Sequence, residues 1–157
     1  MQMTMLCVGQ KMPDWVTTGV QEYLPRLSGQ CQLALKEVAP AKRSKSGSAI
    51  NYMAEEAVRL QQVFSVGNPI KVVLDERGAL VDTKALSKRM EQWLQSGRDV
   101  VFVVGGPDGL APEIKQQADW MWSLTPLTLP HPMVRIMLAE QLYRAYSLLN
   151  NHPYHRE

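Results

Sequence analysis

The segment VVFVVGGPDG, residues 100–109, sets the fold class of this chain. Its first five residues are all apolar, without the alternation of a strand that has one face in water. Such a strand is buried on both faces, as in a parallel sheet covered by helices. The run ends at Gly105 and Gly106, and a Pro-Asp-Gly turn follows. These residues predict a central parallel strand that carries a glycine-rich turn at its carboxyl end.

Strand and helix patterns alternate on both sides of this segment. Apolar spacing predicts further strands at residues 3–8, 31–38, 70–74 and 122–124. Helical spacing predicts helices at residues 13–27, 48–64, 82–96, 112–118 and 133–149. This order is typical of an α/β fold with a mainly parallel sheet and helices on both faces. Without an internal repeat or linker, residues 1–157 form a single predicted domain.

Composition excludes several classes of protein. The chain is 45% apolar and 20% charged, as in ordinary soluble domains, and no apolar run approaches the length of a membrane span. The first residues do not form a secretion signal, so we expect a cytoplasmic protein. Cys7 and Cys31 fall in predicted strands and are expected to be free buried thiols. No spacing of Cys and His resembles a metal site, and the net charge of +2 alone does not indicate nucleic-acid binding.

Three predicted strand ends carry residues suited to ligand binding. Leu74 precedes Asp75, the glycine-rich turn occupies residues 105–109, and TPLTLP occupies residues 125–130. Ligands of open α/β sheets bind beyond the carboxyl ends of the strands, and glycine lets them approach the backbone. The patterns GxGxxG, GxxxxGK[ST] and GxSxG are absent, which argues against a dinucleotide site, a P-loop and a nucleophile elbow. We expect a pocket of backbone groups and apolar walls, although PDG alone is also typical of a simple turn.

The predicted helix at residues 133–149 is apolar around most of its circumference. Glu140, Arg144 and Ser147 gather on its one polar side. We therefore expect this helix to pack against the sheet on one side and against another subunit on the other. Arg135 projects from the apolar side, either reaching the rim or facing an anionic or carbonyl group in an interface cleft.

Two polar segments offer groups for binding RNA. Residues 40–47 carry Lys42, Arg43 and Lys45, which form either a solvated linker or an arm that contacts phosphate. The end of the chain, residues 150–157, offers proton transfer by His, stacking by Tyr and phosphate binding by Arg. The alternative for this tail is a disordered polar end.

The sequence also resembles a known family from end to end. The sequence resembles the RlmH (YbeA-like) family of SPOUT-class methyltransferases, which methylate N3 of a pseudouridine in large-subunit ribosomal RNA. Asp108, where Glu is common, and Pro126 are mild departures. The resemblance is carried by KMPDW at 11–15, LD..G at 74–78, GRDV at 97–100, GGPDG at 105–109, LTLPHP at 127–132, AEQLYRA at 139–145 and NHPYHRE at 151–157.

The resemblance implies a fold, a cofactor and an assembly that spacing does not show. The C-terminal part would form a trefoil knot, although protein chains are almost never knotted. The protein would be a homodimer with active sites at its interface. S-adenosylmethionine would lie in the knot, and the substrate would be ribosomal RNA within the assembled ribosome. The implied cofactor-binding residues are Leu74, Gly105, Gly106, Thr125, Pro126, Leu127, Thr128, Leu129 and Pro130.

The transfer needs a deprotonated imide nitrogen held in line with the methyl group. The tail groups His152, Tyr154, His155 and Arg156 are candidates for assisting deprotonation, and Arg135 is a candidate for orienting base or phosphate. Lys42, Arg43 and Lys45 would contact the RNA backbone.

Two alternatives remain at the level of sequence. One is a non-catalytic RNA-binding or ribosome-assembly protein on the same fold. The other is a small hydrolase that uses His152 or His155 with Asp108, although no activated Ser or Cys nucleophile accompanies them.

Overall fold

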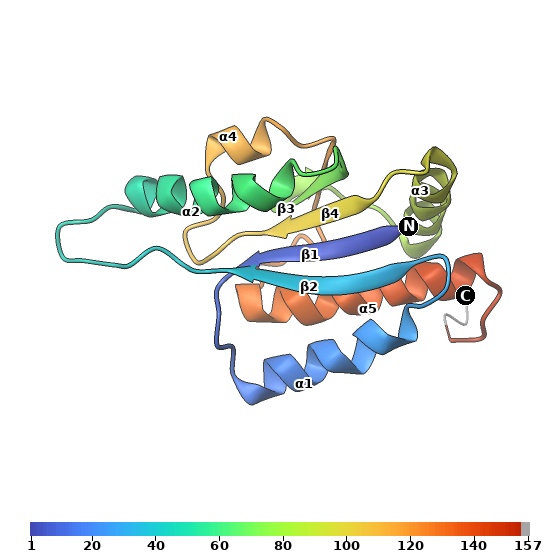
Figure 1. Ribbon diagram of the computed structural model, residues 1–157. Helices are drawn as coiled ribbons and strands as arrows, with labels where there is room; N and C mark the ends of the chain where they lie inside the picture. The colour runs from blue at the N-terminus through green and yellow to red at the C-terminus, as the bar shows by residue number, and fades with distance from the viewer. Residues whose placement is uncertain (155–157) are drawn as a thin grey trace.

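The computed structural model describes residues 1–154, and strands alternate with helices along this length (Figure 1). The α/β class predicted from the sequence is confirmed. The elements are β1 (Gln2–Val8), α1 (Asp14–Tyr23), a 3₁₀ turn η1 (Leu24–Arg26), β2 (Gln32–Val38), α2 (Ala49–Phe64), β3 (Ile70–Ala79), α3 (Thr83–Ser96), β4 (Val100–Val104), α4 (Pro112–Lys115), β5 (Trp120–Trp122) and α5 (His131–Leu149).

The sheet has the order β2-β1-β4-β3-β5, and each neighbouring pair is parallel. Strand β4 lies between β1 and β3, and all five of its residues are buried, as the run VVFVV predicts. Figure 1 shows α2 and α4 on one face of the sheet and α1 and α5 on the other. Each face has its own apolar core, and α3 contributes to the core beneath α5. Cys7 and Cys31 are free buried thiols, as expected.

Several boundaries differ from the sequence prediction. Helix α1 ends at Tyr23 and is followed by η1, and α5 begins two residues earlier than predicted, at His131. Strand β3 continues past Leu74 through a bulge, and Ala79 then pairs with Trp122, so β5 begins two residues earlier than predicted. Gly78 permits this pairing, because a Cβ there would lie 2.7 Å from backbone atoms of β5. Helix α4 ends at Lys115, since the chain must enter β5 by Trp120.

Helix ends follow the capping residues of the sequence. Ser48 accepts a hydrogen bond from the Asn51 amide at 3.3 Å, and Asp82 accepts one from the Ala85 amide at 2.8 Å. Gly97 ends α3 in the left-handed conformation, with φ of 73°. Ser147, predicted on the polar side of α5, is instead buried, and its hydroxyl donates to the Arg144 carbonyl at 2.7 Å.

The direction of α5 decides where the ends of this helix lie. The helix begins at His131, near the carboxyl ends of the strands, and runs beneath the sheet toward the N-terminus of the chain (Figure 1). Nineteen residues span about 28 Å at the rise of an α-helix. The loop before α5 and the described residues after it, 150–154, therefore lie at opposite edges of the sheet. The trefoil knot stays a prediction. Within residues 1–154, no helix has the length and apolar character needed to cross a membrane.

Candidate active site

A cavity of about 500 Å³ opens at the carboxyl ends of β3 and β4. The predicted cofactor-binding residues line it, except Pro126 and Pro130, which belong to the same loop but do not line the cavity. The first turn of α5 and the extended end of β3 close its other sides. The lining residues that the sequence reasoning had not assigned to the cofactor include Glu76, Arg77, Lys115, Trp122, His131 and Val134.

The glycine-rich turn presents backbone rather than side chains to this cavity. The Gly109 amide donates to the Gly106 carbonyl at 3.0 Å, and Gly109 has a φ of 84°. A Cβ at Gly105 would lie 2.9 Å from Cγ of Leu110. A Cβ at Gly106 would lie 3.1 Å from Cγ1 of Val8. The turn is therefore tight, and its backbone groups are accessible to a ligand.

The loop before α5 forms the facing wall and is held by its own hydrogen bonds. The Ser123 hydroxyl donates to the Thr125 carbonyl at 2.9 Å, and the Thr125 hydroxyl accepts from the Leu127 amide at 3.1 Å. The side chain of Leu127 is 72% exposed. An apolar side chain held open at the edge of a cavity offers surface that a bound ligand would cover.

Charged groups at the rim are partly paired. Asp75 contacts the Lys115 ammonium at 2.9 Å and accepts a hydrogen bond from the Arg77 amide at 2.8 Å. Partial burial opposes ionisation of Asp75, but these contacts outweigh it and lower its pKa, so the carboxylate is charged at neutral pH. Glu76 and Asp108 add two further carboxylates to the lining.

His131, the first residue of α5, is a neutral group in this cavity. Burial, and then the charge of Arg135, lower the pKa of His131 from its ordinary value of 6.5. Because the unfolded chain takes up this proton more readily, the contribution of His131 to stability is present above pH 6.5. It is lost as the pH falls through the folded value.

Arg135 is buried and internally paired. Its side chain is 1% exposed and contacts the Glu37 carboxylate at 2.5 Å. It also donates to the Gly9 carbonyl at 2.9 Å, and so links α5 to the ends of β1 and β2. Of the two predicted orientations, snorkelling to the rim is wrong, because the guanidinium lies inside the protein facing a carboxylate and a carbonyl group. It borders a smaller cavity of about 170 Å³ beside α1, not the larger cavity.

The described part of the tail packs against the far end of α5. The Tyr154 hydroxyl donates to Glu140 at 3.0 Å, and its ring lies 4.7 Å from the Tyr143 ring. The His152 amide donates to the Ser147 carbonyl at 2.8 Å. Burial, and then the bond to Glu140, raise the pKa of Tyr154 to about 12, so this phenol keeps its proton at neutral pH in this arrangement. His155 and Arg156 lie outside the described residues.

The structure does not bring the described tail residues, 150–154, to the cavity of the same chain. Helix α5 separates His152 from the cavity by about its own length, roughly 28 Å. For the same reason, His152 and Asp108 do not meet within one chain, which removes the hydrolase reading based on that pair. Among residues 1–154, no cluster of three or more His, Cys, Asp or Glu side chains could hold a metal ion.

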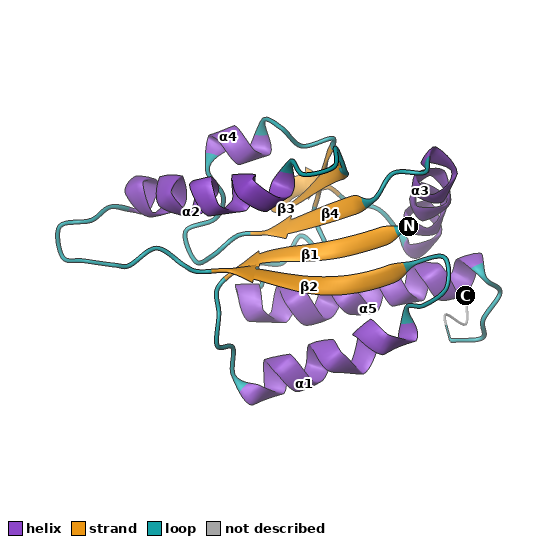
Figure 2. Cartoon of the chain, viewed as in Figure 1, coloured by secondary structure: helices purple, strands orange, loops and turns teal. Residues whose placement is uncertain are grey.

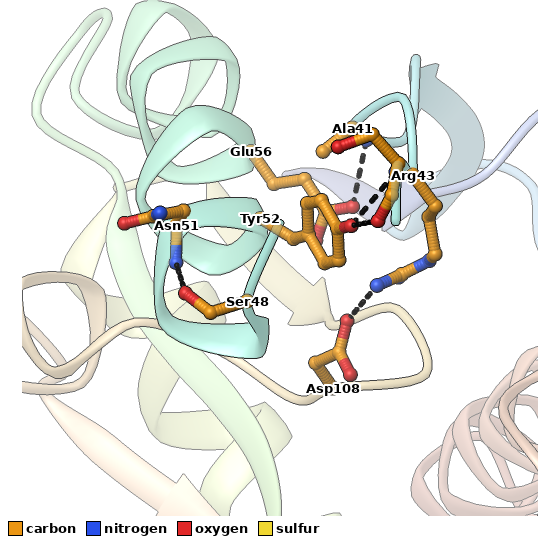
Figure 3. Close-up of polar contacts among 8 residues, drawn as sticks. Ala41, Arg43, Ser48, Asn51, Tyr52, Glu56 and Asp108 are labelled. Carbon is orange, nitrogen blue, oxygen red and sulfur yellow. Dashed lines mark hydrogen bonds and ion pairs between the residues drawn. The ribbon is translucent and has the colours of Figure 1, made fainter. Parts of the chain in front are cut away.

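The three basic residues between β2 and α2 differ in their surroundings. Lys42 and Lys45 are exposed on a connection that extends past the strand ends (Figure 2). Arg43 instead forms an ion pair with Asp108 of the glycine-rich turn (Figure 3). Sequence separates these two residues by 65 positions, so no local pattern could have predicted their contact.

Comparison with known proteins agrees with this architecture and identifies the family. The sequence profile described as "Predicted SPOUT methyltransferase" matches residues 1–155. The chain belongs to the SPOUT methyltransferase family. A protein of Hydrogenovibrio crunogenus named ribosomal RNA large subunit methyltransferase H is 52% identical over 157 residues, which is 100% of both chains. A protein of the same name from Nitrosococcus oceani is 47% identical over 156 residues, 99% of each chain.

Two solved structures share the fold at low sequence identity. A probable methylase family protein from Haemophilus influenzae matches with a TM-score of 0.58 and 15% identity, over 96% of this chain and 69% of that one. A putative methyltransferase from Legionella pneumophila, solved with bound SAM, matches with a TM-score of 0.53 and 12% identity, over 92% and 66%. At such identities the likeness concerns the fold alone.

Proposed function

We propose that this SPOUT methyltransferase uses S-adenosylmethionine to methylate N3 of a pseudouridine in large-subunit ribosomal RNA, within a site built by two copies of the chain. The observation that carries the proposal is the cavity of about 500 Å³, walled by a glycine turn and apolar side chains at the carboxyl ends of β3 and β4. The names of full-length relatives at 45–52% identity support the choice of RNA.

The cavity suits S-adenosylmethionine in size and in chemistry. Its volume falls within the range of small-molecule sites, roughly 300–1,000 Å³. Leu74, Leu127 and Leu129 offer apolar surface to an adenine ring, while the turn at residues 105–109 offers backbone hydrogen-bonding groups. The carboxylates Asp75, Glu76 and Asp108 line the cavity and place negative charge near a ligand that carries a sulfonium and an ammonium group, although Asp75 and Asp108 are also ion-paired with Lys115 and Arg43. The described residues therefore fit this cofactor.

Bound S-adenosylmethionine would supply an activated methyl group, so the protein has to position the reactants and assist loss of the imide proton. The cavity walls would hold S-adenosylmethionine at the strand ends. Of the candidates for moving the proton, His152 follows α5 at the other edge of the sheet, and His155 lies outside the described residues. Tyr154 is suited to stacking and hydrogen-bond donation, because a phenol with a pKa of about 12 is a poor base at neutral pH.

This separation supports a homodimer with composite sites. Residues 150–154 of the tail lie about 28 Å from the cavity of their own chain, so we propose that they act on the cavity of a second copy. The half-buried apolar side chains of α5, such as Met133 and Met137, offer surface for contact with that copy. The composite site would thus combine the cavity of one chain with the tail of its partner.

Ribosomal RNA within the ribosome is the proposed substrate, and the cytoplasm is the proposed location. The exposed cations Lys42 and Lys45 would contact phosphate. Their electrostatic contribution to RNA affinity would weaken as the salt concentration rises. Because the net charge is only +2, we propose that the assembled ribosomal surface supplies much of the specificity.

Calorimetry with S-adenosylmethionine and mass spectrometry of ribosomal RNA test this function together. We expect binding of the cofactor to the purified protein, and loss of one pseudouridine methylation in cells that lack the gene. Absence of binding at millimolar cofactor would rule out the transferase. Cofactor binding with unchanged RNA methylation would rule out this substrate, and ribosome-assembly defects without any change in methylation would favour the assembly protein.

The neutral state of His131 leads to a prediction for cofactor affinity. As the pH falls through the lowered pKa of His131, we expect the affinity for S-adenosylmethionine to fall by about two- to fivefold, because a protonated imidazole in the cavity would repel the cationic cofactor. Calorimetry at pH 5.5 and 7.5 measures this change. His131→Asn serves as the control and should remove the pH dependence. An equal dependence in both proteins would assign the effect to another group.

A further inference from the structure

The connection between β2 and α2, residues 39–48, is anchored at its start by a buried carboxylate. Glu56 of α2 is 1% exposed, and its Oε2 accepts a hydrogen bond from the Ala41 amide at 2.9 Å (Figure 3). Its other oxygen lies beside the glycine-rich turn, since a Cβ at Gly106 would lie 3.5 Å from Oε1. One side chain thus fixes the start of the connection next to the wall of the cofactor cavity.

Tyr52 anchors the middle of the same connection. Its hydroxyl accepts from the Ser44 amide at 2.8 Å and donates to the Ser44 carbonyl at 2.9 Å. Gly47 leaves room for this contact, because a Cβ there would lie 2.2 Å from the Tyr52 oxygen. The connection is therefore docked at two points rather than free to move as an arm.

Arg43 lies between these anchors and faces the glycine-rich turn. Its guanidinium is 4.5 Å from the centre of the Tyr52 ring and forms an ion pair with Asp108. The Asp108 side chain is 23% exposed and lines the cofactor cavity, whereas Arg43 does not line it. Tyr52 thus holds the guanidinium on one side, while Asp108 is its partner on the other (Figure 3).

We propose that Arg43 is a positioning residue for the cofactor cavity, which acts by holding the turn at residues 105–109 through Asp108. This inference rests on the proposed function for its choice of ligand. It gives Arg43 a role different from that of Lys42 and Lys45, whose exposed ammonium groups stay available for phosphate. An ion pair that is partly exposed contributes modestly to stability. We therefore expect loss of Arg43 to weaken cofactor binding moderately and not to abolish it.

The first test measures cofactor affinity in the absence of RNA. For Arg43→Ala we expect calorimetry to show S-adenosylmethionine bound about two- to fivefold more weakly, the range for a pair of this exposure. Lys42→Ala removes the same charge from the same connection and should leave the affinity unchanged. Arg43→Lys keeps the charge and should recover part of the loss. In Arg43→Ala with Asp108→Ala, the two effects should not add.

The second test does not depend on the cofactor. Hydrogen exchange of the ligand-free protein should be faster at the amides of Gly105, Gly106, Asp108 and Gly109 in Arg43→Ala, and unchanged there in Lys42→Ala. Tyr52→Phe keeps the ring but removes the hydroxyl anchor, and it should raise exchange at the same turn to a smaller degree.

Each outcome separates the inference from the proposed function. If wild-type protein does not bind S-adenosylmethionine, the proposed function fails while the exchange result still decides the role of Arg43. Exchange at residues 105–109 that is equal in Arg43→Ala and Lys42→Ala would overturn the inference. Equal cofactor affinities in those two variants, or additive effects of Arg43→Ala and Asp108→Ala, would overturn it as well.

Discussion

A chain that ends after Asn151 is expected to bind S-adenosylmethionine with wild-type affinity and to lose methyl transfer by about 10²- to 10⁴-fold, the size of a general acid–base contribution. The reason is geometric. The described tail residues pack on the far end of α5, through Tyr154 and the His152 amide, and within residues 1–154 none of them lines the cavity. Calorimetry gives the affinity, and single-turnover transfer to ribosomes gives the rate.

The truncation also removes the packing of Tyr154 on Tyr143, so it needs a control variant that keeps this packing. Tyr154→Phe keeps the ring and removes only the bond to Glu140, so it separates packing from the other functions of the tail. Thermal unfolding should place both variants close to the wild type. A truncated protein that is folded and fully active would show that the tail has no catalytic part.

Mixed dimers show which chain supplies the tail. Thr128→Trp, at an exposed position of the cavity wall, should block cofactor binding while leaving the tail intact. Dimers formed from equal amounts of this variant and the truncated chain should have about a quarter of wild-type activity, because half are mixed and each mixed dimer has one complete site. If the tail served its own chain, the mixture would be inactive like its two components.

The fold was predictable where a local pattern carries its own reason. The run VVFVV is buried from end to end because both of its neighbours and both layers of helices cover it. The turn after it lines the cavity because strand ends in a parallel sheet meet at one edge. Ser48 and Gly97 likewise mark helix ends by chemistry confined to one turn.

Features that depend on long-range packing were not predictable in this way. The bulge of β3 against β5 depends on two backbones approaching at Gly78. The contact of Arg43 with Asp108 depends on two loops that share one edge of the sheet. The separation of the tail from the cavity follows from the direction of α5 beneath the sheet, which helical periodicity alone does not define.

Arg135→Met is expected to lower the free energy of unfolding by about 2–4 kcal/mol, because it breaks a pair that holds a buried guanidinium. The figure lies toward the lower end of the range for buried pairs, since the Glu37 side chain is 30% exposed and water can reach it. Methionine keeps the apolar stem, so the loss comes from the charge and from the hydrogen bond to Gly9. Urea unfolding measures the change.

Lys36→Met is the matched control, because Lys36 is exposed on the same strand as Glu37 and should cost less than about 0.5 kcal/mol. The comparison also tests the catalytic role predicted for Arg135. A variant with wild-type stability and lost transfer would mean that the guanidinium leaves Glu37 to act on the substrate. The variant could instead be destabilised but bind the cofactor normally when it is kept folded at low temperature. That result would mean that Arg135 joins α5 to the sheet. We expect the second result, because the Arg135 guanidinium contacts Glu37 and the Gly9 carbonyl from inside the protein.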